Sequence, residues 1–429
     1  VLCGAATGAA MLIAARLARG AAAGIIAPQA IGLIQQMYPP KVRGRAFGVY
    51  GAVAGISTAI GPLLGGTILA RFGGGDAWRY VFYLFIPIAV LAFVIGLFTL
   101  PRDRPRAEDH RLDGLGTLLL GAGVVFAMLP LIEASSNGSK PGWWRLPVGV
   151  VLLAAFFAWE RRLESRGGSP LLSPKLLAIR GYSVGTAIGL TFYAGFTGIF
   201  LSFALFFQQG LKLTPLHGAL DTIVFVITSA VCAIISGRIV QRFGQPMVAA
   251  GCLAAAIGLF LTALLIRHAT AGNAAAELFA PLLLAGLGAG LVITPNQTLT
   301  MHSVPRAAGG TAAGGFQTGQ RIGTAIGTAL AGSLFFNELT RSLSAAKQGA
   351  AAAAGGGVPN AAGSAASLPQ AATADLVAGY QHAAQVSLFG SAGLIALACV
   401  VAVADVLVPH RAPAANEAPL VPAAEAGTI

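Results

Sequence analysis

The hydrophobic positions of this chain fall in long continuous runs that are separated by short polar connections. Most runs are close to the ~20 residues that an α-helix needs to cross about 30 Å of hydrocarbon. They do not alternate between apolar and polar residues, as strands of a membrane barrel do, so they predict helices. Eleven spans are expected, at about 9–36, 46–70, 80–100, 114–133, 146–163, 181–208, 215–237, 247–267, 278–302, 309–336 and 384–408.

One segment of the chain occurs twice. Residues 20–66 align without a gap with residues 286–332, and the tetrapeptide Thr-Ala-Ile-Gly recurs within them together with several glycines. Duplicated helical units of this kind are typical of secondary transporters. The even number of spans between the copies predicts that 24–66 and 290–332 superpose as helix pairs with the same orientation in the membrane, about an axis along its normal.

Composition places the chain in lipid. Hydrophobic residues make up 56% of it and charged residues 10%, and the mean hydropathy is +0.76, which leaves too little polar surface for a soluble globule. An all-α integral membrane protein is therefore expected. The net charge of +12 comes mainly from lysine and arginine on alternate connections, so it indicates membrane orientation rather than nucleic-acid binding. This pattern predicts a multi-pass protein of the cell membrane with a cytoplasmic C-terminus.

The repeat also predicts the domain organisation. A partial N-terminal bundle is expected at 1–105, two additional central spans at 106–170, and a six-span C-terminal bundle at 171–410. Within that bundle, the Ala, Gly and Ser-rich residues 342–374 are expected to form a flexible loop, and 411–429 a disordered tail. Three spans precede the second copy but not the first, so three missing spans are inferred and fourteen in all. The central spans are expected to lie outside both bundles and away from the main cavity.

The side chains suggest no catalytic or metal-binding cluster. The four cysteines stand singly within or beside apolar runs, and the six histidines lie in connections or at span edges. No Ser-His-Asp set, phosphate loop or carboxylate pair can be assembled within the spans. We therefore expect neither an enzyme nor a cofactor or metal.

Three motifs resemble those of a known transporter family. The span at 46–70 contains the pattern GxxxxxGPxxGG, formed by Gly55, Gly61, Pro62, Gly65 and Gly66. The segment 16–20 is similar to RxxQG, with Arg19 where glutamine is usual. A degenerate cytoplasmic loop motif, GxxxDRxGR, is formed by Gly237, Arg238, Arg242 and Gly244, and Gln241 replaces its aspartate.

These motifs and the two central spans resemble the fourteen-span drug:proton antiporters of the major facilitator superfamily (EmrB/QacA type). The resemblance implies two six-helix bundles and a proton-coupled transporter that exports lipophilic or cationic drugs, and thereby confers antibiotic resistance. Export of a specific metabolite or siderophore is the alternative within transport; a membrane-embedded enzyme or sensor is the alternative from another class. The expected partners are the lipid bilayer, a small lipophilic substrate and protons, with a periplasmic adaptor protein as a further candidate.

The glycines of the GxxxxxGPxxGG pattern have a direct physical interpretation. Gly61 and Gly65 are four residues apart, as are Gly51 and Gly55, so each pair lies on one helical face and allows a neighbouring helix to approach closely. Pro62 removes a backbone donor and bends the span. The segment either shapes the cavity and restricts leak or serves only tight packing.

Two arginines inside spans are candidates for proton coupling. A guanidinium within a span costs roughly 2.5 to 3.5 kcal/mol on insertion scales, so Arg16 and Arg321 are expected to point toward the interface between the halves. The resemblance links the position of Arg16 to proton transfer. The alternative is an arginine that extends to the membrane interface.

The span that contains Arg321 has a polar face. Gln317, Arg321, Thr324 and Thr328 follow helical spacing, and Gln320 lies beside them. This face either lines a central cavity or satisfies polar groups between helices.

Asp221 is the carboxylate that lies deepest in an apolar run. Burial there would favour its protonated form and suit a proton carrier; the alternative is an acid that reaches the outer interface.

An aromatic stripe occupies the span 181–208. It consists of Phe192, Phe196, Phe200, Phe203 and Phe207. The stripe either holds planar lipophilic substrates or serves as packing and a lipid-facing surface.

Overall fold

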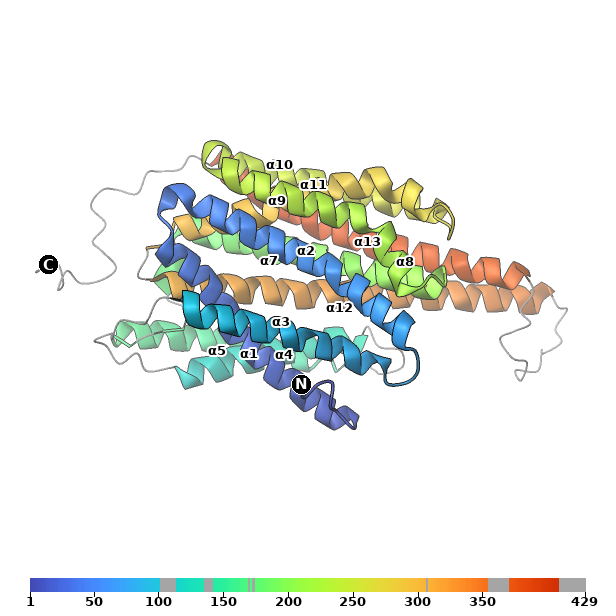
Figure 1. Ribbon diagram of the computed structural model, residues 1–429, viewed down its shortest axis with the longest axis horizontal. Coiled ribbons are helices and arrows are strands. Elements are labelled where there is room, and N and C mark those ends of the chain that lie inside the picture. The colour runs from blue at the N-terminus through green and yellow to red at the C-terminus, as the bar shows by residue number, and fades with distance from the viewer. Residues whose placement is uncertain are drawn as a thin grey trace, which may run out of the picture.

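The part of the chain that the computed structural model describes contains helices and no strands. It comprises residues 1–100, 113–134, 142–168, 170–171, 174–305, 308–353 and 370–408. The helices run roughly along one axis in an elongated bundle (Figure 1). They are α1 (Ala9–Met37), α2 (Pro40–Phe72), α3 (Ala77–Thr99), α4 (Gly114–Ala134), α5 (Arg145–Ser165), α6 (Pro174–Ala178), α7 (Arg180–Leu205) with the π-helical turn η1 (Phe206–Gly210), α8 (Pro215–Asp221), α9 (Ile223–Phe243), α10 (Gln245–Leu265) with the 3₁₀ turn η2 (Ile266–His268), α11 (Ala274–His302), α12 (Gly309–Ala353) and α13 (Gln370–Leu407).

Local sequence signals account for several helix ends. Pro40 occupies the first turn of α2, where its missing N–H costs nothing. The hydroxyl of Thr214 accepts a hydrogen bond from the His217 amide, 3.3 Å away, and caps α8. Gly244 has a φ of 57° between α9 and α10, a conformation that glycine adopts without steric cost.

Two sequence expectations about the spans need correction. The span expected at 215–237 is divided into α8 and α9, which meet at Thr222. The segment 342–374, expected as a flexible loop, is helical up to Ala353, because the alanine-rich sequence has a high helix propensity, and helical again from Gln370. The rest of that segment and the tail 411–429 lie outside the described residues.

Among the described helices, seven have the length and hydropathy needed to cross a membrane, fewer than the eleven spans expected. The helix α12 is not among these seven, although it is long. Its glycines, threonines, glutamines and Arg321 lower its hydropathy. This composition is that of a helix with a polar face.

The two copies of the repeat have the same orientation. In Figure 1, α1 and α11 run toward the left of the molecule, and α2 and α12 return toward the right. The Gln35 side chain donates a hydrogen bond to the carbonyl oxygen of Met301 at 2.9 Å, across a separation of 266 residues, which is the offset of the repeat. The copies therefore meet at equivalent positions.

Most of the buried core belongs to the C-terminal group of helices, α7 and α9–α13. Their most extensive contacts join α10 to α11, α7 to α12, α9 to α11 and α10 to α13. The core includes fully buried phenylalanines such as Phe206 and Phe335. The N-terminal group, α1–α3, buries few side chains, and its main connection to the C-terminal group is made by α2.

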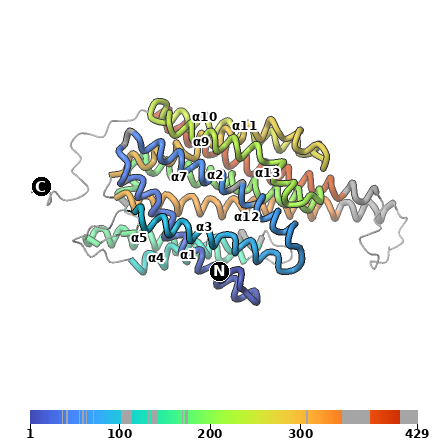
Figure 2. Tube along the Cα trace, in the orientation of Figure 1, coloured from blue at the N-terminus to red at the C-terminus, as the bar shows by residue number. Residues whose placement is uncertain are grey.

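Glycine allows α2 to lie directly against α9 (Figure 2). A Cβ atom at Gly237 would lie 2.5 Å from the carbonyl oxygen of Gly44 and 2.7 Å from Cα of Gly48. Side chains at these positions would force the helices apart, because such distances are well below van der Waals contact. The two helices thus touch backbone to backbone.

The central helices α4 and α5 pair mainly with each other, and α4 also contacts α12. Glu133, beyond the apolar stretch Gly114–Pro130, connects the pair at one end. It accepts hydrogen bonds from the Gly142 amide, at 3.0 Å, and from the Arg145 guanidinium. These two donors, the amide first, lower the pKa of Glu133 below its usual value.

We predict that Gly237→Ala destabilises the protein by about 1–3 kcal/mol, because the new methyl group must separate α9 from α2. Gly61→Ala is the matched control, since its Cβ would meet no atom within 4 Å. That substitution should be neutral or stabilising by up to about 1 kcal/mol. Thermal unfolding of the detergent-purified protein measures both effects, and equal melting temperatures for the two variants would contradict the backbone contact.

We predict that Glu133→Gln lowers the melting temperature at pH 7 and has a smaller effect at low pH. The folded-state pKa of Glu133 is lowered, so its stabilising contribution is present above the ordinary value of 4.5 and is lost as the pH falls through the folded-state pKa. Glu277→Gln is the control, because Glu277 forms no ion pair with a described residue. An unchanged difference in melting temperature between pH 7 and pH 3 would exclude this contribution.

Candidate functional site

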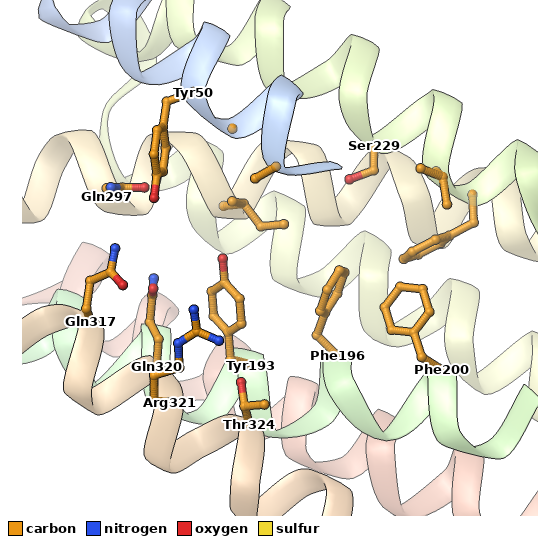
Figure 3. A pocket seen from close by; sticks show the side chains of 15 residues that line it. Tyr50, Tyr193, Phe196, Phe200, Ser229, Gln297, Gln317, Gln320, Arg321 and Thr324 are labelled. Carbon is orange, nitrogen blue, oxygen red and sulfur yellow. The ribbon is translucent and has the colours of Figure 1, made fainter. Parts of the chain in front are cut away.

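A cavity of about 260 Å³ lies between α2 and the C-terminal group (Figure 3). α2 forms one wall, and α7, α9, α11 and α12 form the others. The cavity is lined by Tyr50, Gly51, Ala54, Tyr193, Phe196, Phe200, Phe225, Val226, Ser229, Ile293, Gln297, Gln317, Gln320, Arg321 and Thr324.

One end of the cavity is polar. Gln317, Gln320 and Arg321 point into it from α12 (Figure 3), at positions that helical spacing brings to one face. Gln297 of α11 lies across from them. The Gln317 amide also donates a hydrogen bond to the Ala27 carbonyl oxygen of α1 at 3.4 Å, so it connects the cavity wall to the first copy of the repeat.

The other end of the cavity is aromatic. The ring centroid of Phe200 lies 5.2 Å from that of Phe196 and 6.0 Å from that of Phe225, and Phe196 and Phe225 are 5.9 Å apart. These distances are typical of interacting aromatic rings. The three rings form a continuous apolar end of the cavity, with the Phe200 ring edge-on to the other two.

The aromatic stripe of α7 is divided between the cavity and the core. Phe196 and Phe200 line the cavity, whereas Phe192 and Phe203 are buried among other helices, with exposed fractions of 1% and 5%. At about 100° per residue, Phe192 lies about 40° from Phe196 around the helix, on the side away from Tyr193. For Phe192 and Phe203, the structure therefore favours the packing alternative over the pocket.

Arg321 is the one formally charged side chain among the lining residues. It forms no ion pair with any residue in the described part of the chain. No aspartate or glutamate lines the cavity within that part either, so a cationic substrate would find no counter-charge there.

Arg16 does not line this cavity. It is exposed on α1, and its guanidinium carbon lies 5.7 Å from the ring centroid of Phe82 on α3. Arg19 lies over Phe85 in the same way, at 5.6 Å. Arg16 was expected at the interface between the halves. Instead, it makes a cation–π contact with the neighbouring helix α3.

Asp221 also lies away from the cavity lining. It ends α8 and is half-buried, and burial raises the pKa of its carboxyl group, although the nearby His217 partly opposes this. The expectation of an acid inside a long span is corrected by the division between α8 and α9. Its suitability as a proton carrier is unaffected by that correction.

The GxxxxxGPxxGG residues serve different purposes within α2. A Cβ at Gly66 would lie 2.9 Å from the Leu216 amide nitrogen, so this glycine allows contact with α8, whereas no described atom lies within 4 Å of a Cβ at Gly61 or Gly65. The close approach expected at these two glycines is therefore not found among the described residues. Gly55 and Pro62 lie in α2, and their side-chain surroundings fall outside the described residues.

The loop motif has a structural explanation in part. Gly237 makes the backbone contact with α2, and Gly244 provides the positive φ that separates α9 from α10. Arg238 is exposed, and Arg242 lies over the Phe243 ring at 5.8 Å. Neither arginine approaches the cavity lining.

Several lining residues were not foreseen from the sequence, among them Tyr50, Tyr193 and Ser229. Gln297 could have been recognised, because it and Asn296 form a polar pair within an apolar run, which is rare in a membrane span. The tyrosines carry no comparable signal, since tyrosine is common both in cores and at membrane interfaces.

Comparison with known proteins identifies the family. The family model of the Major Facilitator Superfamily matches residues 1–328. The chain belongs to this superfamily. A human protein described as the organic anion transporter MFSD10 (TETRAN) has a similar fold: its crystal structure matches with a TM-score of 0.56 and 16% identity, over 94% of this chain and 73% of that one. The all-helical membrane fold expected from the sequence is thereby confirmed.

Relatives within the superfamily include named transporters. A "Probable actinorhodin transporter" of Streptomyces coelicolor is 32% identical over 79% of this chain and 59% of its own length. A puromycin resistance protein of Streptomyces alboniger is 35% identical over 77% of this chain and 64% of its own. A triacylglyceride transporter of Mycobacterium tuberculosis is 31% identical over 78% and 66%. This superfamily member thus spans about three-fifths of the length of the relatives that it matches.

We predict that the cavity of this superfamily member is open to water-soluble reagents. With the four native cysteines replaced by serine, Thr324→Cys should react with a polar maleimide in membranes, because Thr324 lines the cavity. Thr262→Cys is the control and should not react, since Thr262 of α10 has an exposed fraction of 0%. Similar labelling of both variants, read by a mass shift, would argue against the cavity.

Proposed function

We propose that this chain belongs to a proton-coupled secondary transporter that exports lipophilic compounds across the cytoplasmic membrane. The observation that carries the proposal is the cavity between α2 and the C-terminal group, with its aromatic end and its polar end. A site between two groups of helices is suited to alternating access. Relatives named for transport and for puromycin resistance support export rather than catalysis.

The contacts between the two copies of the repeat supply a mechanism for closing one end of the cavity. Gln35 donates hydrogen bonds to the carbonyl oxygens of Met301, at 2.9 Å, and Val304, at 3.5 Å. The Arg43 guanidinium donates to the carbonyl oxygen of Gln35 at 3.0 Å. Opening the cavity at this end would require these bonds to break and α1 to move away from α11.

The basic residues favour a cytoplasmic position for this end. Positively charged side chains are favoured on the cytoplasmic side of membrane proteins. Lys41, Arg43 and Arg45 lie at the junction of α1 and α2, and Arg238 and Arg242 lie at the same end of α9. In this orientation α13 ends at the cytoplasmic side, where the hydrogen bonds of Gln35 join α1 to α11. The fourteen-span arrangement is part of the same proposal.

Proton coupling is assigned to Asp221. Its half-buried carboxyl group has a raised pKa, so it takes up a proton more readily than an exposed aspartate does. It belongs to α8, the short helix whose Leu216 packs against Gly66 of α2. Loss of the proton would place a charge at the end of this helix and favour its movement toward water.

Export of a specific metabolite is the second candidate. Relatives named as triacylglyceride transporters, with about the same identity as the drug-related ones, support a lipid as cargo. The aromatic end of the cavity and its volume favour a smaller, planar compound instead.

We predict that everted membrane vesicles that contain the protein accumulate a lipophilic dye when their interior is acidified. A protonophore should abolish this uptake. Asp221→Asn should abolish it as well, because the side chain can no longer carry a proton, whereas Glu277→Gln, at the same end of the bundle, should not. Uptake that survives Asp221→Asn at normal expression would remove Asp221 from the mechanism, and uptake independent of the gradient would contradict proton coupling.

A further inference from the structure

The cavity combines one positive charge with an aromatic surface. Arg321 lies at its polar end, beside the amides of Gln317 and Gln320 and close to the Tyr193 hydroxyl group (Figure 3). We propose that Arg321 determines substrate specificity, and that the substrates are planar aromatic compounds that carry an anionic oxygen at one end. This inference rests on the proposed transport function and names the substrate class of the same site.

The charge balance of the cavity favours an anion over a cation. Arg321 has no ion pair with a described residue, and none of the described aspartates and glutamates lines the cavity. A guanidinium remains charged at all physiological pH values, and it binds carboxylates and phenolates through charge-assisted hydrogen bonds. A cation in the same place would be repelled by the guanidinium.

The neighbouring polar groups can complete the recognition of an oxygen atom. The Gln317 and Gln320 amides and the tyrosine hydroxyl groups can donate hydrogen bonds, and an anionic oxygen accepts several. The Gln297 amide lies opposite, on α11, so donors are available on both sides of the polar end. Glutamine can also accept hydrogen bonds, so these residues alone would not discriminate by charge. Discrimination therefore depends on Arg321.

The aromatic end limits the shape of the substrate. Tyr193 and Phe200 are seven residues apart on α7, which corresponds to about 10 Å along the helix. This length matches a fused system of two or three rings. The cavity volume, about 260 Å³, lies near the lower end of the ~300–1,000 Å³ that is typical of small-molecule sites. A compact planar molecule that stacks on one of these rings and places its oxygen at Arg321 fits both limits.

Two fluorescent probes of similar size and opposite charge test this inference. Resorufin and proflavine both have three fused planar rings; resorufin is an anion at pH 7.5 and proflavine is a cation. Binding is measured by fluorescence anisotropy with the detergent-purified protein, without any proton gradient. We expect resorufin to bind about tenfold more tightly than proflavine. Equal affinities, or tighter binding of proflavine, would overturn the proposed substrate class.

Substitutions of Arg321 test whether this residue causes the preference for resorufin over proflavine. Arg321→Gln should weaken resorufin binding about tenfold and leave proflavine binding equal or stronger, whereas Arg321→Lys should retain most of the preference. Arg341→Gln is the matched control, because Arg341 is an exposed arginine of the same helix outside the cavity lining. Resorufin binding that is unchanged in a monodisperse Arg321→Gln variant would exclude Arg321 as the specificity residue. The preference of the unaltered protein remains an independent test.

Transport of the two dyes separates this inference from the proposed function. If resorufin binds selectively but is not accumulated by energised vesicles, the substrate class stands and proton-coupled export is contradicted. If the vesicles accumulate both dyes equally, transport stands and the inference is overturned. Selective, gradient-driven accumulation of resorufin would support both.

Discussion

The contact between α2 and α9 determines how the rest of the molecule can be arranged. Gly237 leaves no room for a side chain between its backbone and that of Gly44 and Gly48, so the helices meet at the smallest separation that two backbones permit. The other contacts between the two groups, of α1 with α12 and of α2 with α8 and α11, are each less extensive. The width of the cavity beside Tyr50 and Gly51 therefore depends on this contact, since α2 supplies the wall that faces α12.

Close packing through glycine also positions α12, in which one face packs against a neighbouring helix and another face lines the cavity. Gly323 and Gly327 bring the helix against the backbone of α7 at Leu190 and Ala194. The polar side chains that line the cavity occupy the other face. A helix that packs through glycine on one side can hold a charged residue such as Arg321 at a defined position on the other, because the backbone itself is fixed by close contact. The glycine contacts of α12 with α7 thus help to fix the positions of the side chains that line the cavity.

Much of this fold could be predicted from the sequence. The continuous apolar runs indicate which segments are long enough to cross a membrane, and the gapless repeat indicates two units with the same arrangement. The polar face at Gln317 and Arg321 was also visible from helical spacing, and the structure places it at the cavity. The break before α9 was not visible, because Thr222 is neither proline nor glycine. The position of Arg16 could not be predicted for another reason: the sequence gives the cost of a guanidinium in hydrocarbon, but not the place of the Phe82 ring on a neighbouring helix.

The length of α12 has a consequence for how movement can be observed. Its 45 residues extend over about 68 Å, roughly twice the thickness of the hydrocarbon core, and Figure 1 shows it projecting beyond the other helices together with α13. A change in the tilt of α12 at the cavity displaces its far end by a larger distance, because displacement grows with the length of the helix. A spectroscopic label near Thr340 would therefore report small rearrangements around Arg321 in amplified form, from outside the membrane.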